Sequence, residues 1–321
     1  MRSILERLPK GSRVAVIRLR SLGDSVLTTP ALALLKAHRP DLRIGVVVED
    51  RFRAVFQDNP DVDRILPQEA RAVFGWAPRL TLNLHGGTRS MALTLASCAA
   101  FRAGFAHHRY SFVYSHAIPR AQEILGQERV VHTAEHLASA MFWLGVPRTE
   151  IPRASLYCGA GFGLPRGLQS PSPRLKPRSQ AEAYSTAVFH PFASNPTKAW
   201  PAGRFITVAE ELARTGLDPV FLAGPSDNTH PFEQFTIVKN APLADVKALI
   251  RGAQLFIGND SGPAHIAAAF GVPSVVLFGS SAPAIWGPWR TDGRVLRRPG
   301  GIASITPDEV LEAAHSLKVV A

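Results

Sequence analysis

The stretch of this sequence best suited to chemistry on a phosphorylated substrate is residues 257–265, Ile-Gly-Asn-Asp-Ser-Gly-Pro-Ala-His. It stands between an apolar run that predicts a strand and an Ala-rich run that predicts a helix. The free N–H groups at the start of such a helix, with the positive end of its dipole, attract an anion such as a phosphate. Asp260 and His265 add a carboxylate and an imidazole, which helix capping does not need. The alternative is an ordinary capped helix, with Asp260 or Ser261 as N-cap and Pro263 in its first turn.

Asp24 is the residue best placed to act as a base. It lies in a polar turn, residues 20–25, directly after the first predicted strand. A carboxylate at the mouth of a ligand cleft can take the proton from a hydroxyl nucleophile. The alternative is that Asp24 only caps the helix that follows.

A polar loop at residues 191–200 follows the first predicted strand of the second half. Its polar side chains include Ser194, Asn195, Thr197 and Lys198. Hydroxyl donors beside one lysine can clamp a phosphate. The Gly-rich frame of a P-loop is absent, and an ordinary surface loop remains the alternative.

The elements that must position these residues alternate between apolar strands and helical segments. We expect strands at 14–19, 44–48, 64–66, 80–84, 187–190, 219–222, 235–239, 254–257 and 274–278. We expect helices at 27–38, 52–56, 90–100, 132–144, 202–214, 244–251, 266–270 and 306–317, and assign no regular structure to 105–120. The alternation implies parallel βαβ units, and ligands bind beyond the carboxyl ends of such strands.

The composition divides the chain into two α/β halves. Gly, Pro, Ser and Arg dominate from about residue 159 to 185, where apolar periodicity disappears. This composition is typical of a linker. We therefore expect a first domain over residues 1–165, a linker over 166–185, and a second domain over 186–321 with a terminal helix.

The bulk composition fits a folded protein with anionic partners. The 321 residues include 36 Lys and Arg against 25 Asp and Glu, a formal net charge of +11. This charge favours nucleic acid, phosphorylated substrates or an acidic membrane face, but basic and aromatic residues do not interleave as in RNA-binding segments. Only Cys98 and Cys158 occur, so we expect a reducing compartment. We find no secretory signal and no run long enough to span a bilayer.

Two further patterns have weak functional readings. His132, Glu135 and His136 match H-x-x-E-H, an inverted zinc-protease pattern, although an amphipathic helix explains the same residues. The Gly-rich residues 159–163 follow no clear strand, so we interpret them as flexible chain rather than a dinucleotide fingerprint.

Four segments of the sequence, taken together, resemble glycosyltransferase family 9, the lipopolysaccharide heptosyltransferases. They are residues 17–32, which contain Arg-Ser-Leu-Gly-Asp-Ser; residues 58–63, Asp-Asn-Pro-Asp-Val-Asp; residues 198–205, which begin Lys-Ala-Trp-Pro; and residues 258–279, which begin Gly-Asn-Asp-Ser-Gly-Pro-Ala-His. Their order and spacing extend over nearly the whole chain.

The resemblance implies a GT-B fold, in which two Rossmann-like doubly wound parallel-sheet domains face each other across a cleft. It implies inverting transfer of a sugar, heptose from ADP-heptose, to a lipopolysaccharide-core or related glycolipid acceptor, without a cofactor or metal. Asp24 maps to the proposed base. The donor-binding residues implied are Ala193, Ser194, Lys198, Asp260, Ser261, Gly262 and His265. Arg20 and Ser21, beside Asp24, are expected on the acceptor side.

The expected partners are a nucleotide sugar and an anionic glycolipid, with no nucleic acid. We expect a cytoplasmic protein in peripheral contact with the inner membrane. A non-catalytic nucleotide-sugar-binding protein of the same fold is the alternative. It would bind donor without turning it over.

Overall fold

The computed structural model describes residues 2–159, 185–291 and 293–317. The chain divides into two compact units, Met1–Tyr157 (unit 1) and Cys158–Ala321 (unit 2). The predicted linker, 166–185, lies outside the described residues except for Ser185, as do residues 160–163 of the Gly-rich segment. The linker and the domain limits drawn around it therefore stay predictions.

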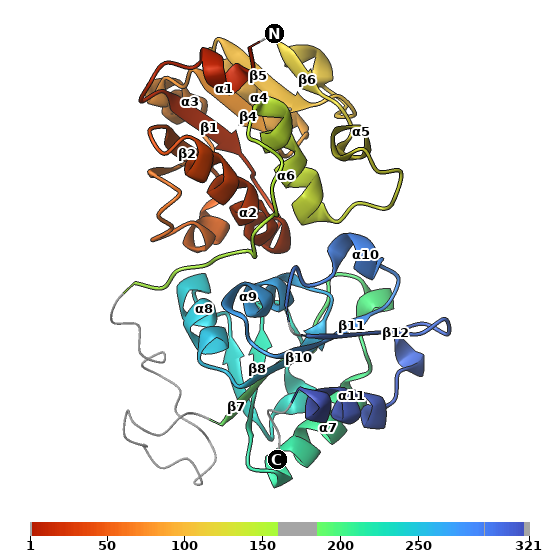
Figure 1. The fold of residues 1–321 in the computed structure, drawn as a ribbon. Helices are drawn as coiled ribbons and strands as arrows, with labels where there is room; N and C mark the ends of the chain where they lie inside the picture. The colour runs from red at the N-terminus through yellow and green to blue at the C-terminus, as the bar shows by residue number, and fades with distance from the viewer. Residues whose placement is uncertain (1, 160–184, 292, 318–321) are drawn as a thin grey trace. The chain divides into compact units, whose positions relative to one another are not determined.

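Unit 1 contains a parallel sheet of six strands in the order β3-β2-β1-β4-β5-β6 (Figure 1). The strands are β1 (Arg13–Ile17), β2 (Arg43–Val47), β3 (Arg64–Leu66), β4 (Leu80–Asn83), β5 (Phe101–Phe105) and β6 (His116–Ile118). The helices are α1 (Ile4–Arg7), α2 (Leu22–His38), η1 (Asp50–Val55), α3 (Ala70–Trp76), α4 (Thr88–Ala96), η2 (Ser111–Val113), α5 (Ala121–Leu125) and α6 (Thr133–Leu144).

Unit 2 repeats this topology, with strand order β12-β11-β10-β7-β8-β9. The strands are β7 (Thr186–His190), β8 (Asp218–Ala223), β9 (Thr236–Lys239), β10 (Leu255–Asn259), β11 (Ser274–Phe278) and β12 (Arg294–Arg297). The helices are η3 (Pro196–Lys198), α7 (Ala202–Arg214), η4 (His230–Phe232), α8 (Leu243–Arg251), α9 (Gly262–Phe270), α10 (Pro283–Trp286), η5 (Ile302–Ser304) and α11 (Pro307–Ser316).

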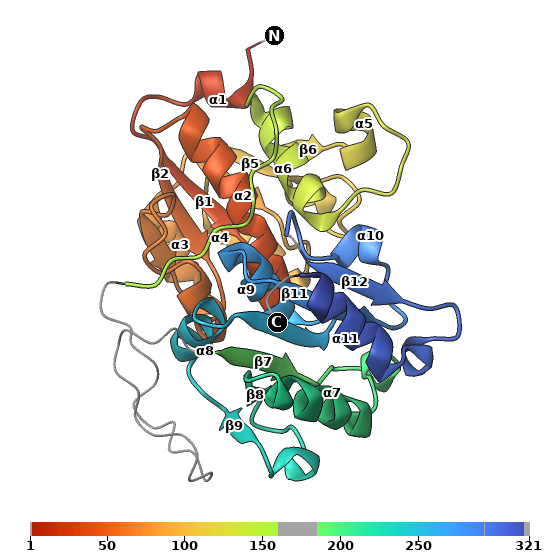
Figure 2. The same cartoon turned by 60° about the horizontal axis from the view of Figure 1, so that its bottom comes forward.

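Each sheet is covered by helices on both faces (Figures 1 and 2). In unit 1, α3 and α4 pack over Ala15 and Ile17 of β1, while α2 packs against α6. In unit 2, α7 and α11 bury an aromatic core that includes Phe189 and Phe205, while α8 packs against α9. The predicted parallel α/β architecture is confirmed.

The strand order creates a topological switch point in each sheet. In unit 1 it lies between β1 and β4, and in unit 2 it lies between β7 and β10, because the chain winds outward in opposite directions from these pairs. Open α/β sheets bind ligands at such points, beyond the carboxyl ends of the strands. The carboxyl ends of these four strands are therefore where a site is expected.

The predicted elements were wrong mainly at helix starts and short segments. α2 begins at Leu22 and α9 at Gly262, each about one turn before the expected start. Small and polar residues there form the first helical turn, behind the N-cap residues Ser21 and Ser261. The unassigned region 105–120 contains β6, which is only three residues long. Other elements that the sequence analysis missed are α1, α3, α5, α10, β5 and β12.

Within the three described ranges, no helix combines the length and the apolar character that crossing a bilayer requires.

Candidate active site

Asp24 lies in the first turn of α2, at the carboxyl end of β1. Its Oδ2 accepts hydrogen bonds from the backbone N–H of Ser21, at 3.4 Å, and from the Ser21 hydroxyl, at 3.1 Å. Ser21 is the N-cap and Asp24 the third helical residue, so Asp24 supports the cap without being the N-cap itself. Arg20 and Ser21 are exposed beside it.

Arg18 holds the other oxygen of the Asp24 carboxylate, a contact that the sequence analysis missed. Arg18 Nη2 lies 2.6 Å from Asp24 Oδ1, and Nη1 donates to the Leu84 carbonyl at 2.5 Å. Arg18 is buried, with 9% exposure, and extends from the end of β1 towards the end of β4. The guanidinium thus neutralises Asp24 and fixes its orientation at the switch point of unit 1.

Four imidazoles lie around this ion pair. Burial, with the nearby charges of Arg18 and Arg20, lowers the pKa of His85, which follows β4. Burial lowers the pKa values of His108 and His136 to about 4, and Arg18 contributes to both shifts. The fourth ring, His107, contacts both of these histidine rings, with ring-centroid distances of 5.0 and 5.4 Å. At neutral pH this edge of unit 1 therefore presents uncharged imidazoles beside two arginines.

The predicted donor residues of unit 2 meet at a polar cluster. Lys198 Nζ lies 3.1 Å from Asp260 Oδ2, and the Ser281 hydroxyl donates to the same oxygen at 2.5 Å. The Asp260 side chain is 8% exposed and that of Lys198 is 30% exposed. Ser281 was not predicted, although it follows β11, and the sequence analysis expected ligands beyond the carboxyl ends of such strands. The Lys198 side chain thus remains partly accessible, whereas that of Asp260 is largely covered.

Ser261 and His190 occupy the switch point of unit 2. Ser261 is the N-cap of α9, and its hydroxyl lies 3.0 Å from His190 Nδ1, at the end of β7. Burial lowers the pKa of His190 to about 4, so this ring is neutral near pH 7. Gly262 opens the helix, and His265 is only 5% exposed within its first turn. The start of α9 therefore combines free N–H groups with a hydroxyl whose orientation His190 restrains.

The loop at 191–200 is fastened to β10 by one buried amide. Asn259 Nδ2 donates to the Pro191 carbonyl at 2.8 Å, and Asn259 Oδ1 accepts from the Trp200 N–H at 3.2 Å. Trp200 Nε1 donates in turn to Ile305 O at 3.0 Å. These bonds hold both ends of the loop that presents Lys198.

Gly279 allows the same loop to approach β11 closely. A Cβ atom at this position would lie 2.1 Å from the Thr197 carbonyl oxygen. The Thr197 hydroxyl lies 2.9 Å from the Ser280 hydroxyl. Ala193 is half-buried and Ser194 exposed on the same loop. The loop therefore lies against the segment that supplies Ser281.

The H-x-x-E-H residues serve other roles in this structure. His132 is the N-cap of α6, with Nδ1 accepting from Ala134 N at 3.1 Å. Glu135 is ion-paired with Arg129, at 2.5 Å, and His136 stacks on Phe105 with a centroid distance of 4.0 Å. Among the residues described, no group of three or more His, Cys, Asp or Glu side chains is placed to hold a metal ion.

Comparison with known proteins supports the expected fold. The chain is 26% identical over 301 residues to lipopolysaccharide heptosyltransferase 3 of Escherichia coli, and the match covers 84% of each chain. A glycosyltransferase family 9 structure from Veillonella parvula superposes with a TM-score of 0.79 at 23% identity, covering 95% of this chain and 97% of that one. The structure of E. coli ADP-heptose lipopolysaccharide heptosyltransferase II gives a TM-score of 0.75 at 21% identity, covering 95% and 98%. The GT-B fold that the resemblance implied is confirmed.

Membership follows from the sequence itself. The family model for glycosyltransferase family 9 (heptosyltransferase) matches residues 79–301, well over half of the chain. The match contains β4 to β12, the polar cluster at Lys198 and Asp260, and the Ser261–His190 contact. Asp24 lies before the matched residues. The chain belongs to glycosyltransferase family 9, the heptosyltransferase family.

Proposed function

We propose that this protein is an inverting glycosyltransferase that moves heptose from ADP-heptose to a lipopolysaccharide-core or related glycolipid. Family membership supports the glycosyltransferase activity. Support for the donor and acceptor comes from relatives that are described as lipopolysaccharide heptosyltransferases, one of them as an ADP-heptose enzyme. The observation that carries the donor assignment is the accessible Lys198 ammonium beside the start of α9, in unit 2.

Unit 2 binds the donor in this proposal. Lys198, the Ser261 hydroxyl and the first N–H groups of α9 interact with the diphosphate, whose negative charge grows as ADP leaves. Asp260 positions Lys198 and, with His265, is proposed to contact hydroxyl groups of the sugar or ribose. Ala193 and Ser194 line the same donor site, with Gly262 allowing close approach to the helix start.

Unit 1 supplies the base and the acceptor contacts. Asp24 takes the proton of the acceptor hydroxyl. At the same time the oxygen of that hydroxyl forms a bond to the anomeric carbon. The bond from that carbon to the diphosphate oxygen breaks, and ADP leaves with the electron pair, so the anomeric configuration inverts. Arg18 orients the carboxylate. Arg20 and Ser21 are proposed to contact the acceptor. No metal ion and no cofactor take part in this scheme.

We also propose that the enzyme works at the cytoplasmic face of the inner membrane. The support is the net charge of +11, which suits an anionic glycolipid in an anionic bilayer. Binding to vesicles that contain phosphatidylglycerol should weaken steeply as salt rises. Absent or salt-independent binding would remove the peripheral assignment.

A thermal-shift panel with ADP, UDP, GDP and ADP-heptose tests the donor assignment. Ligands that bind the folded state raise the unfolding temperature, so ADP and ADP-heptose should shift it more than UDP or GDP. The shift should shrink in Lys198→Met. Equal shifts with all three nucleotides would contradict an adenosine donor. Donor binding without turnover on any lipopolysaccharide-core acceptor would instead identify a non-catalytic nucleotide-sugar-binding protein.

A further inference from the structure

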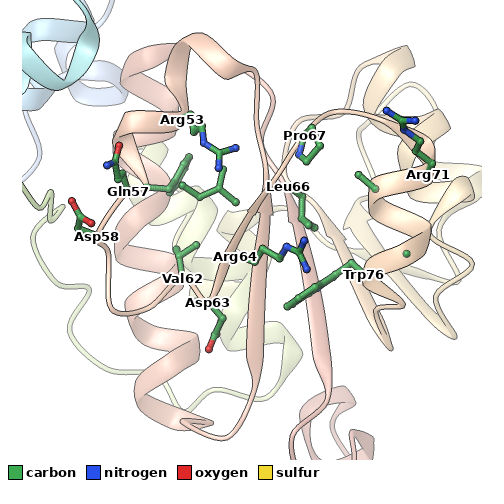
Figure 3. A pocket seen from close by; sticks show the side chains of 14 residues that line it. Arg53, Gln57, Asp58, Val62, Asp63, Arg64, Leu66, Pro67, Arg71 and Trp76 are labelled. Atoms are coloured by element: carbon green, nitrogen blue, oxygen red, sulfur yellow. The ribbon is translucent and has the colours of Figure 1, made fainter. Parts of the chain in front are cut away.

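Unit 1 holds a pocket of about 760 Å³ at the outer edge of its sheet (Figure 3). Its lining comes from η1, the loop that follows it, the edge strand β3 and α3, and includes neither Asp24 nor Arg18. Its volume lies in the range of pockets that enclose small organic ligands. It is therefore a second candidate site on this unit.

Two arginines give the pocket an excess of positive charge. Three arginines line it, of which Arg71 is ion-paired with Glu69 at 2.8 Å. Arg53 and Arg64 have no hydrogen-bond or ion-pair partner for their side chains within the part of the chain that the structure describes. Figure 3 shows both guanidinium groups directed towards the central part of the lining, between η1 and α3.

The acidic residues of the lining offset only part of this charge. Asp63 already accepts from Lys36 Nζ at 2.9 Å and from the backbone N–H of Ile44 at 2.7 Å. Asp58 lies at the outer end of the lining (Figure 3). Two unpaired guanidinium groups thus face one unpaired carboxylate, which favours an anionic occupant.

Trp76 gives the pocket a fixed apolar wall. Its Nε1 donates to the Val14 carbonyl at 3.1 Å, and the side chain is 8% exposed. A Cβ atom on Gly45 would lie 2.9 Å from the same nitrogen, so the ring packs directly on the β2 backbone. Arg64 Cζ lies 5.9 Å from the ring centroid, within reach of a cation–π contact. The Trp76 wall is therefore positioned before any ligand arrives, which lowers the entropic cost of binding.

We propose that this pocket binds an anionic saccharide, with Arg53 and Arg64 holding its phosphate or carboxylate group. A guanidinium matches either oxyanion with paired N–H donors. The sugar ring would lie against Leu66 and Trp76, whose apolar surfaces complement its C–H faces. In a glycosyltransferase the natural occupant is an anionic part of the acceptor remote from the reacting hydroxyl, an assignment that rests on the proposed function.

Titration calorimetry on the full chain tests the binding step without donor or turnover. The probes are glucose 6-phosphate, glucuronate, glucose and inorganic phosphate. At least one of the two anionic sugars should bind, and Arg53→Gln/Arg64→Gln should weaken it tenfold or more. Which anionic sugar binds more tightly tells whether the pocket prefers phosphate or carboxylate. Arg7→Gln is the matched control, because Arg7 is also an exposed arginine over an aromatic ring, Phe101, at 4.7 Å.

The proposal fails if neither anionic sugar binds at millimolar concentration, or if the double variant binds as the wild type does. Inorganic phosphate binding as tightly as the phosphosugar would overturn the saccharide part. The double variant must keep the wild-type unfolding temperature in the absence of ligand, which shows that unit 1 is folded. Absence of an ADP-induced shift in the wild type would instead overturn the proposed donor, leaving the pocket result intact. If both proposals hold, the double variant should raise the acceptor KM and leave kcat nearly unchanged.

Discussion

Asp24 Oδ1 and Arg18 Nη2 lie 2.6 Å apart, and both side chains are largely buried, at 15% and 11% exposure. The proposed base is thus half of an ion pair that also ties α2 to the ends of β1 and β4, because Arg18 also donates to Leu84 O. On the proposed mechanism, catalysis and stability are coupled at this pair. Substitution of Asp24 should therefore mainly lower kcat, whereas substitution of Arg18 should mainly lower the stability of unit 1.

Asp24→Asn should lower kcat by about 10²- to 10⁴-fold, because an amide cannot accept the acceptor proton. Donor affinity should be retained, since the proposed donor residues belong to unit 2. Steady-state kinetics together with ADP titration separates these two effects. A variant that keeps near-wild-type kcat would show that Asp24 is not the base.

Arg18→Met should destabilise unit 1 by about 3 kcal/mol, because it leaves a largely buried carboxylate without its counter-ion. Adding Asp24→Asn should recover much of this loss, which chemical denaturation of the single and double variants measures. Arg120→Met is the control. Its ion pair with Glu123 is exposed, at 60% and 51%, so its removal should cost less than about 1 kcal/mol. Additive effects of Arg18→Met and Asp24→Asn would argue against the coupling.

Lys198→Met should weaken ADP binding about 10- to 100-fold, since it removes the accessible cation proposed for the diphosphate. It also leaves Asp260 without its ion-pair partner, so Lys198→Met/Asp260→Asn separates repulsion of the nucleotide from loss of attraction. The double variant should bind ADP better than Lys198→Met alone. Lys239→Met, on β9, is the control for a change of charge. Unaltered ADP affinity in Lys198→Met would exclude the proposed contact.

Gly279→Ala should disturb the loop at 191–200, because its Cβ would lie 2.1 Å from a backbone oxygen, Thr197 O. We expect a loss of about 1–3 kcal/mol in unfolding free energy, as for overpacking in a dense region, and weaker ADP binding. Gly203→Ala is the matched control. A Cβ there meets no atom within 4 Å and lies inside α7, where alanine should stabilise by about 0.5–1 kcal/mol. Equal unfolding free energies and ADP affinities in the two variants would contradict the close approach of the loop to Gly279.

Acidification should destabilise unit 2 through His190. Its folded-state pKa is about 4, below the value of 6.5 for an unperturbed histidine, so the unfolded chain binds the proton first. This contribution is fully present above pH 6.5 and is lost as pH falls from 6.5 to 4. It amounts to at most about 3 kcal/mol.

His190→Asn should flatten this part of the pH–stability curve, as measured by denaturation at pH 7, 5.5 and 4. His230→Asn, at a histidine whose side chain is 83% exposed, should leave the curve unchanged. A wild-type curve that is flat over this range would show that His190 does not titrate as expected.

The sequence predicts the architecture and the proposed donor residues better than it predicts the contacts between them. Alternating apolar runs indicate parallel βαβ units, and the motif around Asp260 and Ser261 places these residues on a strand-to-helix turn. The partners could not be read from local patterns. Ser261 meets His190, and Asp260 meets Ser281, through strands that are adjacent in space and distant along the chain. The Arg18–Asp24 contact similarly depends on where β1 ends relative to the first turn of α2.

Two short strands were missed in the sequence analysis for a related reason. β6 and β12 are edge strands with at most one buried residue each, so they lack the apolar run that marks a buried strand, and neighbouring strands stabilise them more than their own composition does. The pocket with Arg53 and Arg64 was also invisible, because its lining comes from three separate elements. A cavity is a property of packing, which a local pattern does not encode.

The ion pair between Lys198 and Asp260 has a consequence for turnover. The Lys198 ammonium is already neutralised by Asp260. In the proposed donor site, a diphosphate must therefore compete with an internal carboxylate for it. The net attraction between Lys198 and the diphosphate is smaller than an unpaired lysine would provide. After sugar transfer, Asp260 can form its ion pair with Lys198 again as ADP departs. The same pair that weakens capture of the donor should therefore hasten release of the spent nucleotide, favouring repeated cycles over tight retention.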